Sequence, residues 1–203
     1  MDAADTLDAV REAKRTELDR LGSDKLLVAV TGADMKAETI RSAAAARERG
    51  VAGALSAWAD EVAESQGPVA AAFERAGTAA RDRAGRIDAA PAEPDALSAH
   101  LDTVEGTAAR VGAGLVAVPL VLDRFYLQAV GFFVNEADEA IAETFRALRS
   151  GAADLDPARE ALDALGEDER GAAREAAMDA VDVAYDDYAA TLDGMGLDPR
   201  PIC

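Results

Sequence analysis

The residues of this chain that could carry out chemistry are few and widely spaced. Glu136, Glu139 and Glu143 repeat at helical spacing, so their carboxylates would share one helix face, where a hard cation could bind. A carboxylate series of this kind is also typical of a solvated helix face. His100 is the one imidazole and Cys203 the one thiol, so the sequence offers neither a histidine cluster nor an intramolecular disulfide.

No motif for nucleophilic catalysis or phosphate binding accompanies these residues. The sequence has no Walker loop, no G-x-S-x-G elbow, no dinucleotide-binding glycine fingerprint and no C-x-x-C pair. His100 is interpreted as a surface helix residue and Cys203 as an exposed thiol; metal ligation by the first, and a redox or metal-capture role for the second, are the alternatives. Tyr185 and Tyr188 could serve proton or radical chemistry, but their spacing places them in an apolar seam.

Charge and composition narrow the class of protein. The 203 residues include 39 Asp and Glu against 21 Lys and Arg, a formal net charge of −18, and half of the residues are apolar. Such an excess of acid is tolerated best in concentrated salt, which screens self-repulsion, so we expect a halophile-type cytoplasm. Direct nucleic-acid binding is not expected, because it requires clustered Lys and Arg. The acidic N-terminus lacks the pattern of a secretory signal, which favours a cytoplasmic location.

The bulkiest side chains concentrate in residues 110–150, which we interpret as the central helix of a bundle. Pro119 suits a first helical turn and Gly151 a helix end, so the pattern predicts one long helix between them. Asp123 and Arg124 interrupt the apolar run, and neither half is long enough to cross a membrane, which takes about 20 residues. A buried core helix is therefore predicted, with no membrane contact.

Apolar residues spaced three and four apart predict further helices, and the intervening segments read as turns. We expect an amphipathic helix over 2–21 that ends at Gly22, and a loop or helical turn over 25–30. Trp58 is expected to anchor the core. The other predicted elements are helices over 34–64, 68–87, 95–110 and 156–192, with a proline-bearing connection over 88–95.

These elements predict an all-α protein. We expect residues 1–22 to form an N-terminal amphipathic helix. We expect residues 23–193 to form a helical bundle and residues 194–203 to form an extended tail. Within the bundle, the proline-bearing connection separates two helix pairs, 34–88 and 95–193.

Two segments resemble a known family. AAAARERGVAGALSAWADE (residues 43–61) and VAAAFERAGTAARDRAGRI (residues 69–87) resemble the first two helices of the rubrerythrin branch of the ferritin-like superfamily, in the acidic form of salt-loving microbes. The resemblance covers about residues 34–192 and implies a ferritin-like four-helix bundle. In that family, Glu and Glu-x-x-His side chains from two helix pairs hold two iron ions.

The resemblance implies that this chain is a degenerate member, because most iron ligands are replaced. The matched positions are Arg47, Ala80, Arg83, Glu136 and Glu139. The first three stand where the family has Glu, Glu and His, while the carboxylate at the fourth survives. Glu169, the next candidate, is followed by Ala172 rather than by His. We expect no metal; if one binds, Glu136, Glu139 and Glu143 are the candidate ligands.

The substitutions imply that guanidinium charge has replaced metal charge. We expect Arg47 and Arg83 to pair with Glu136 or Glu139 across the bundle, because an unpaired buried charge is costly. The alternative is that both arginines are solvated on the surface.

The resulting functional expectation is a non-enzymatic, ferritin-like protein without a di-iron centre or other cofactor, which acts as an interaction or regulatory module. A homodimer or a protein partner is expected. One alternative is a rubrerythrin-type iron-binding oxidoreductase that handles peroxide or iron through a non-standard carboxylate site. The other is a helical bundle that binds a small molecule or lipid between Ala- and Gly-rich helices.

Overall fold

Every regular element in residues 2–200, the part of the chain that the computed structural model describes, is a helix, so the predicted all-α class is confirmed. The elements are α1 (Ala3–Ala13), α2 (Arg15–Leu21), α3 (Lys25–Thr31), α4 (Ala37–Val62), α5 (Gly67–Ile87), α6 (Ala96–Leu101), α7 (Thr107–Arg110), the π-helical segment η1 (Val111–Ala117), α8 (Val118–Asn135), α9 (Glu139–Ala152), α10 (Asp156–Ala164) and α11 (Glu167–Gly194).

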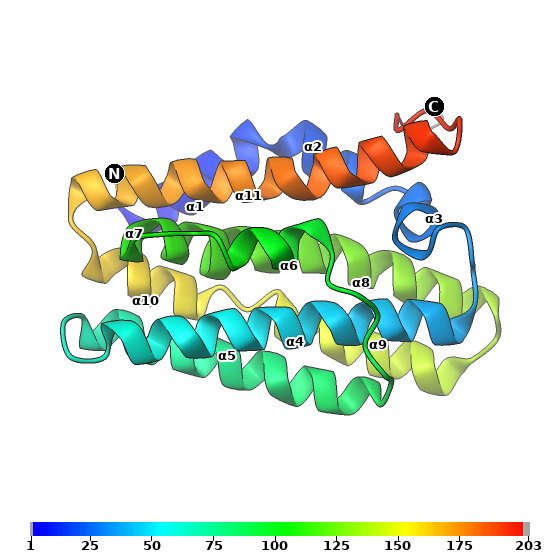
Figure 1. Cartoon of the computed structure of the whole chain (residues 1–203), viewed down its shortest axis with the longest axis horizontal. Helices are drawn as coiled ribbons and strands as arrows, with labels where there is room; N and C mark the ends of the chain where they lie inside the picture. Colours follow the sequence, from blue (N-terminus) through cyan, green and yellow to red (C-terminus); the bar gives the residue numbers. More distant parts are fainter. Residues whose placement is uncertain (1, 201–203) are drawn as a thin grey trace.

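The long helices lie roughly side by side along the long axis of the molecule (Figure 1). In that view α11 runs along the top with α1 and α2, while α4 and α5 lie at the bottom. The continuous helix formed by α7, η1 and α8 lies between these layers and packs against α11, α4 and α9. It therefore provides the centre of the core.

The hairpin of α4 and α5 forms much as its sequence pattern predicts. Pro68 stands in the first turn of α5, where its missing N–H costs no hydrogen bond. Trp58 of α4 is buried and packs edge-on against Phe73 of α5, with ring centroids 5.6 Å apart. This contact confirms Trp58 as a core anchor.

The prediction of one central helix over 119–150 is wrong at both ends. The helix begins earlier, at Thr107, and continues through η1 and past Pro119 to Asn135. The chain then reverses at Ala137, which takes a left-handed φ of 58°, and the Asp138 side chain accepts a hydrogen bond from the Ile141 N–H to cap α9. The second half of the predicted helix is thus a separate helix, α9, which packs against α8.

The predicted N-terminal helix is two helices, separated at Lys14. Lys14 pairs with Asp182 of α11, and both α1 and α2 pack against α11. Residues 25–31 form the short helix α3, in agreement with the helical-turn alternative. The N-terminal segment therefore packs on the same body as the rest of the bundle.

One helix, Thr107–Asn135, is long and apolar enough to cross a membrane by length and composition. In the most apolar 18-residue stretch of this helix, 56% is buried inside the protein. Core helices of soluble proteins meet the same criterion, and this helix is the core helix of the bundle.

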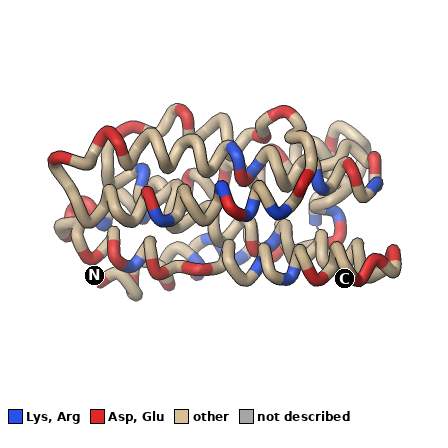
Figure 2. The backbone as a smooth tube through the Cα atoms, turned by 90° about the horizontal axis from the view of Figure 1, so that it is seen from below, with Lys and Arg blue, Asp and Glu red and all other residues tan. Residues whose placement is uncertain are grey.

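Acidic positions are distributed along the whole bundle. Figure 2 shows Asp and Glu on every helix layer in view, with fewer Lys and Arg between them. Many of the exposed arginines pair with an acid one helical turn away, as Arg11 does with Asp8 and Arg159 with Asp156. Such exposed pairs stabilise the fold only weakly.

Two glycines allow the central helix to approach its neighbours closely. A Cβ atom on Gly112 would lie 1.9 Å from the backbone oxygen of Ala173 in α11, and one on Gly114 would lie 2.6 Å from the Trp58 ring. Neither position has room for a side chain, so the spacing of α11, η1 and α4 depends on these glycines.

We predict that Gly112→Ala lowers the free energy of unfolding by at least about 2 kcal/mol, because the added methyl group collides with backbone that cannot move aside. Gly171→Ala in α11 is the control, since a Cβ there meets no atom within 4 Å. It should be neutral or stabilise the protein by up to about 1 kcal/mol. Urea denaturation measures both, and equal effects of the two substitutions would contradict the close-approach argument.

Candidate functional site

Among the described residues, Glu48 is the only charged residue that is buried, with 0% of its surface exposed. It lies on the inner face of α4, at the helical spacing that also buries Ala44, Val51 and Leu55. A carboxylate in this position requires hydrogen-bond donors on all sides, because an unpaired buried charge costs several kcal/mol. The surrounding helices supply them.

Arg83 of α5 and Tyr126 of α8 donate to the Glu48 carboxylate. The Arg83 Nε–Oε1 distance is 2.7 Å and the Nη2–Oε2 distance is 3.0 Å, a two-pronged ion pair. The Tyr126 hydroxyl donates to Oε1 at 2.6 Å. Burial, followed by the negative charge of Glu48, raises the pKa of Tyr126 well above its ordinary value, so the phenol remains a donor. We call Glu48, Arg83 and Tyr126 the core triad.

Arg47, the neighbour of Glu48, faces a different set of residues. Its Nε donates to Asp95 Oδ2 at 2.7 Å, and its guanidinium lies 4.5 Å from the centroid of the Phe125 ring. Only 11% of the Arg47 side chain is exposed. The Arg47 Nη1 atom is buried and has no hydrogen-bond partner among the described residues. Neither Nη group of this guanidinium therefore has a hydrogen-bond partner among the described residues.

Asp95 caps α6 while it holds Arg47. Its Oδ1 accepts hydrogen bonds from the Ser98 backbone N–H at 2.9 Å and from the Ser98 hydroxyl at 2.7 Å. Burial acts to raise the pKa of Asp95, but Arg47 and the Ser98 hydrogen bonds together outweigh it and hold the pKa below its ordinary value. The carboxylate is therefore ionised and fully used.

A pocket of about 240 Å³ opens beside Arg47, between α3, α4, α11 and the connection that precedes α6. Most of its wall is apolar, and the polar lining residues are Arg47, Glu93, Asp95, Asp187, Tyr188 and Thr191. Asp187 is exposed and has no hydrogen bond or ion pair within residues 2–200. Loss of surrounding water, followed by the charge of Asp95, raises the pKa of Asp187 despite the opposing charge of Arg47. We call this cavity the Arg47 pocket.

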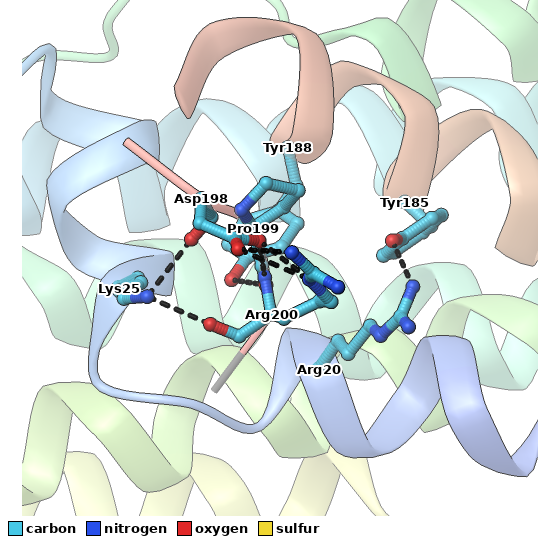
Figure 3. Close-up of polar contacts among 7 residues, drawn as sticks. All are labelled: Arg20, Lys25, Tyr185, Tyr188, Asp198, Pro199 and Arg200. Carbon is cyan, nitrogen blue, oxygen red and sulfur yellow. Dashed lines mark hydrogen bonds and ion pairs between the residues drawn. The ribbon is translucent and has the colours of Figure 1, made fainter. Parts of the chain in front are cut away.

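Tyr188 joins the Arg47 pocket to the C-terminal tail. Tyr188 lines the pocket, and its hydroxyl lies 3.0 Å from the Ser23 hydroxyl. The same hydroxyl donates to the Pro199 carbonyl at 2.9 Å (Figure 3). Lys25 of α3 donates to the Asp198 and Arg200 carbonyls at 2.8 and 2.7 Å. Tyr185 accepts a hydrogen bond from Arg20 at 2.5 Å. Residues 198–200 are thus fastened to α3 and α11.

The predicted pairing of Arg47 and Arg83 with Glu136 or Glu139 is wrong. Both arginines have carboxylate partners, but these are Asp95 and Glu48. Glu136 forms the C-cap of α8, where the chain turns away from the bundle centre, so it cannot follow the core-facing seam.

Arg146 lies beside two of the three carboxylates in the series Glu136, Glu139 and Glu143. Glu139 and Glu143 are exposed on α9, where Arg146 lies 3.9 and 3.1 Å from their carboxylates. Glu136 lies outside that helix. Within residues 2–200, no group of three or more His, Cys, Asp or Glu side chains is placed to hold a metal ion.

The remaining candidates have ordinary positions. Ala80 is buried in the core one turn before Arg83, and His100 is only partly exposed on the short helix α6. Cys203 lies outside the described residues. Sequence reasoning missed Glu48, although it is the single carboxylate that continues the apolar spacing of α4.

We predict that Arg83→Met lowers the free energy of unfolding by about 3 kcal/mol or more, because it leaves the Glu48 charge buried without its cation. Adding Glu48→Gln should recover most of this loss, since the amide oxygen still accepts from Tyr126 and no charge remains. The control is Arg81→Met, an exposed arginine on the same helix that donates to Ser56. Urea denaturation that gives equal losses for Arg83→Met and Arg81→Met would contradict the role assigned to the core triad.

The lowered pKa of Asp95 makes a prediction about acid stability. A carboxyl whose pKa is depressed by folding stabilises the protein fully above the unfolded value of about 3.9, and this contribution is lost as pH falls through the folded value. The difference in unfolding free energy between the wild type and Asp95→Asn should therefore be large at pH 6 and shrink below about pH 4. Asp82→Asn, an exposed acid on α5, is the charge-matched control. A pH-independent difference for Asp95→Asn would show that its ionisation is not coupled to folding.

No protein-family model, curated protein or solved structure matches this chain. A function must therefore be argued from the geometry of the core triad and the Arg47 pocket.

Proposed function

We propose that this protein is a non-enzymatic binding module whose Arg47 pocket takes a small organic molecule. The observation that supports this most directly is the Arg47 guanidinium, which lines the pocket and whose two Nη groups have no hydrogen-bond partner among residues 2–200. A buried donor of this kind is costly unless it is satisfied. Apolar walls with a few polar groups are typical of small-molecule sites.

The position of Tyr188 supports a regulatory role for such binding. Its ring is part of the pocket wall, and its hydroxyl holds residue Pro199 of the tail. A ligand that displaces the ring changes the position of the hydroxyl and so weakens the hold on the tail. Occupancy of the pocket is then reported at the surface, where a protein partner can detect it.

The ferritin-like relationship is part of this proposal. Arg47 and Arg83 project from α4 and α5 into the bundle, and each meets a carboxylate there. We infer that these guanidinium–carboxylate pairs occupy the region in which a ferritin-like ancestor held its metal ions. A protein with this history retains the bundle and uses its interior for binding instead of redox chemistry.

Fragment screening by ligand-observed NMR tests the binding function, with Ala184→Leu as the variant that fills the pocket. Ala184 lines the pocket on α11, whereas Ala176, on the same helix and similarly half-buried, lines none of the described pockets. Fragments of up to about ten non-hydrogen atoms should bind the wild type and Ala176→Leu and lose most of their signal with Ala184→Leu. Absence of binding, or equal binding to both variants, would overturn the proposed function.

A further inference from the structure

The polar lining of the Arg47 pocket carries more negative than positive charge. Arg47 is the only cation among the lining residues, and it is opposed by Asp95, Asp187 and Glu93. Asp95 is occupied by Arg47 and Ser98. Glu93 and Asp187 are exposed, so they lie toward the solvent side of the pocket, while the arginine lies deeper. The mouth of the pocket therefore attracts cations and repels anions.

The deeper part of the pocket offers arginine N–H donors to an oxygen atom that accepts a hydrogen bond. The Arg47 guanidinium is held in place by Asp95 on one side and by the Phe125 ring on another, and its only hydrogen bond among the described residues runs from Nε to Asp95, so its two Nη groups have a fixed position and no partner. A neutral carbonyl or hydroxyl oxygen satisfies this donor. A ligand carboxylate would also satisfy it, but would bring a further negative charge close to Asp95 and Asp187.

We propose that the Arg47 pocket recognises a small organic ammonium ion that also bears a neutral acceptor oxygen and an apolar group, and that this apolar group contacts the walls of the pocket. The oxygen accepts from Arg47, the ammonium group lies against Asp187, and the apolar body packs on Leu21, Leu26 and Leu97. This inference rests on the proposed binding function and names the ligand class for the same site.

The size of the pocket limits the ligand. A water molecule occupies about 30 Å³ of liquid, so 240 Å³ corresponds to about eight waters. An amine with a branched side chain of four or five carbons and one carbonyl group has about this volume. Larger amphiphiles such as lipids do not fit in the pocket as it stands.

Isothermal titration with four probes that share one isobutyl group tests the ligand class. Leucinamide has both the ammonium and the neutral oxygen; isopentylamine lacks the oxygen, 4-methylpentanamide lacks the ammonium, and leucine replaces the amide with a carboxylate. Leucinamide should bind most tightly. Removal of the oxygen should weaken binding at least tenfold, because the buried arginine donor is left unpaired.

Asp187→Asn should weaken leucinamide binding by up to about fivefold, the limit for an exposed ion pair, and should leave 4-methylpentanamide unaffected. Asp186→Asn is the matched control, because Asp186 is the adjacent exposed acid on α11 and does not line the pocket. It should change neither affinity. Equal effects of the two substitutions would overturn the role of Asp187.

The outcomes also separate this inference from the proposed function. If leucine or 4-methylpentanamide binds as tightly as leucinamide, and Ala184→Leu abolishes that binding, the ligand class is wrong and the binding function stands. The ligand class is also wrong, and the binding function also stands, if none of the four probes binds but other fragments bind the wild type and not the Ala184→Leu variant. If no fragment and no probe binds, both are wrong.

Discussion

The burial of one carboxylate constrains the arrangement of this bundle more than any other single feature. Glu48 has no exposed surface, and its position is tolerable only because α5 contributes Arg83 and α8 contributes Tyr126 at hydrogen-bond distance. Three helices from different parts of the chain must therefore keep one relative position. The two-pronged ion pair and the third donor have directional geometry, so they add to the constraint that close packing already places on these helices.

Two adjacent residues of α4, Arg47 and Glu48, point into different parts of the interior. Successive residues of a helix point about 100° apart, so Glu48 reaches Arg83 of α5 and Tyr126 of α8, while Arg47 reaches Asp95 at the start of α6 and the Phe125 ring of α8. Both carboxylate oxygens of Glu48 accept hydrogen bonds, from Arg83 and from Tyr126. Arg47 leaves both Nη groups without a hydrogen-bond partner beside a pocket, and the proposed ligand binding rests on this feature. The core triad thus holds α4 in place, and with it the position of Arg47 beside the pocket.

Residues of α2 and α3 line the Arg47 pocket, and residues 198–200 are fastened next to it through Tyr188. Lys25 and Tyr188 hold the carbonyl groups of residues 198–200, and the same Tyr188 ring lines the pocket. Close packing of α11 on η1 at Gly112 limits how far α11 can move elsewhere along its length.

The sequence by itself determined the helical class, the α4–α5 hairpin, the start of α6 and the anchoring role of Trp58, because these depend on spacing along the chain and on caps such as Asp95 and prolines such as Pro68. It also identified Arg47 and Arg83 as residues of interest. Only the tertiary structure decided their partners, since an ion pair depends on helix rotation and on where the chain reverses. The turn at Ala137 removed Glu136 from the core, and α4 placed Glu48 there instead, at a spacing that apolar periodicity alone does not associate with a charge.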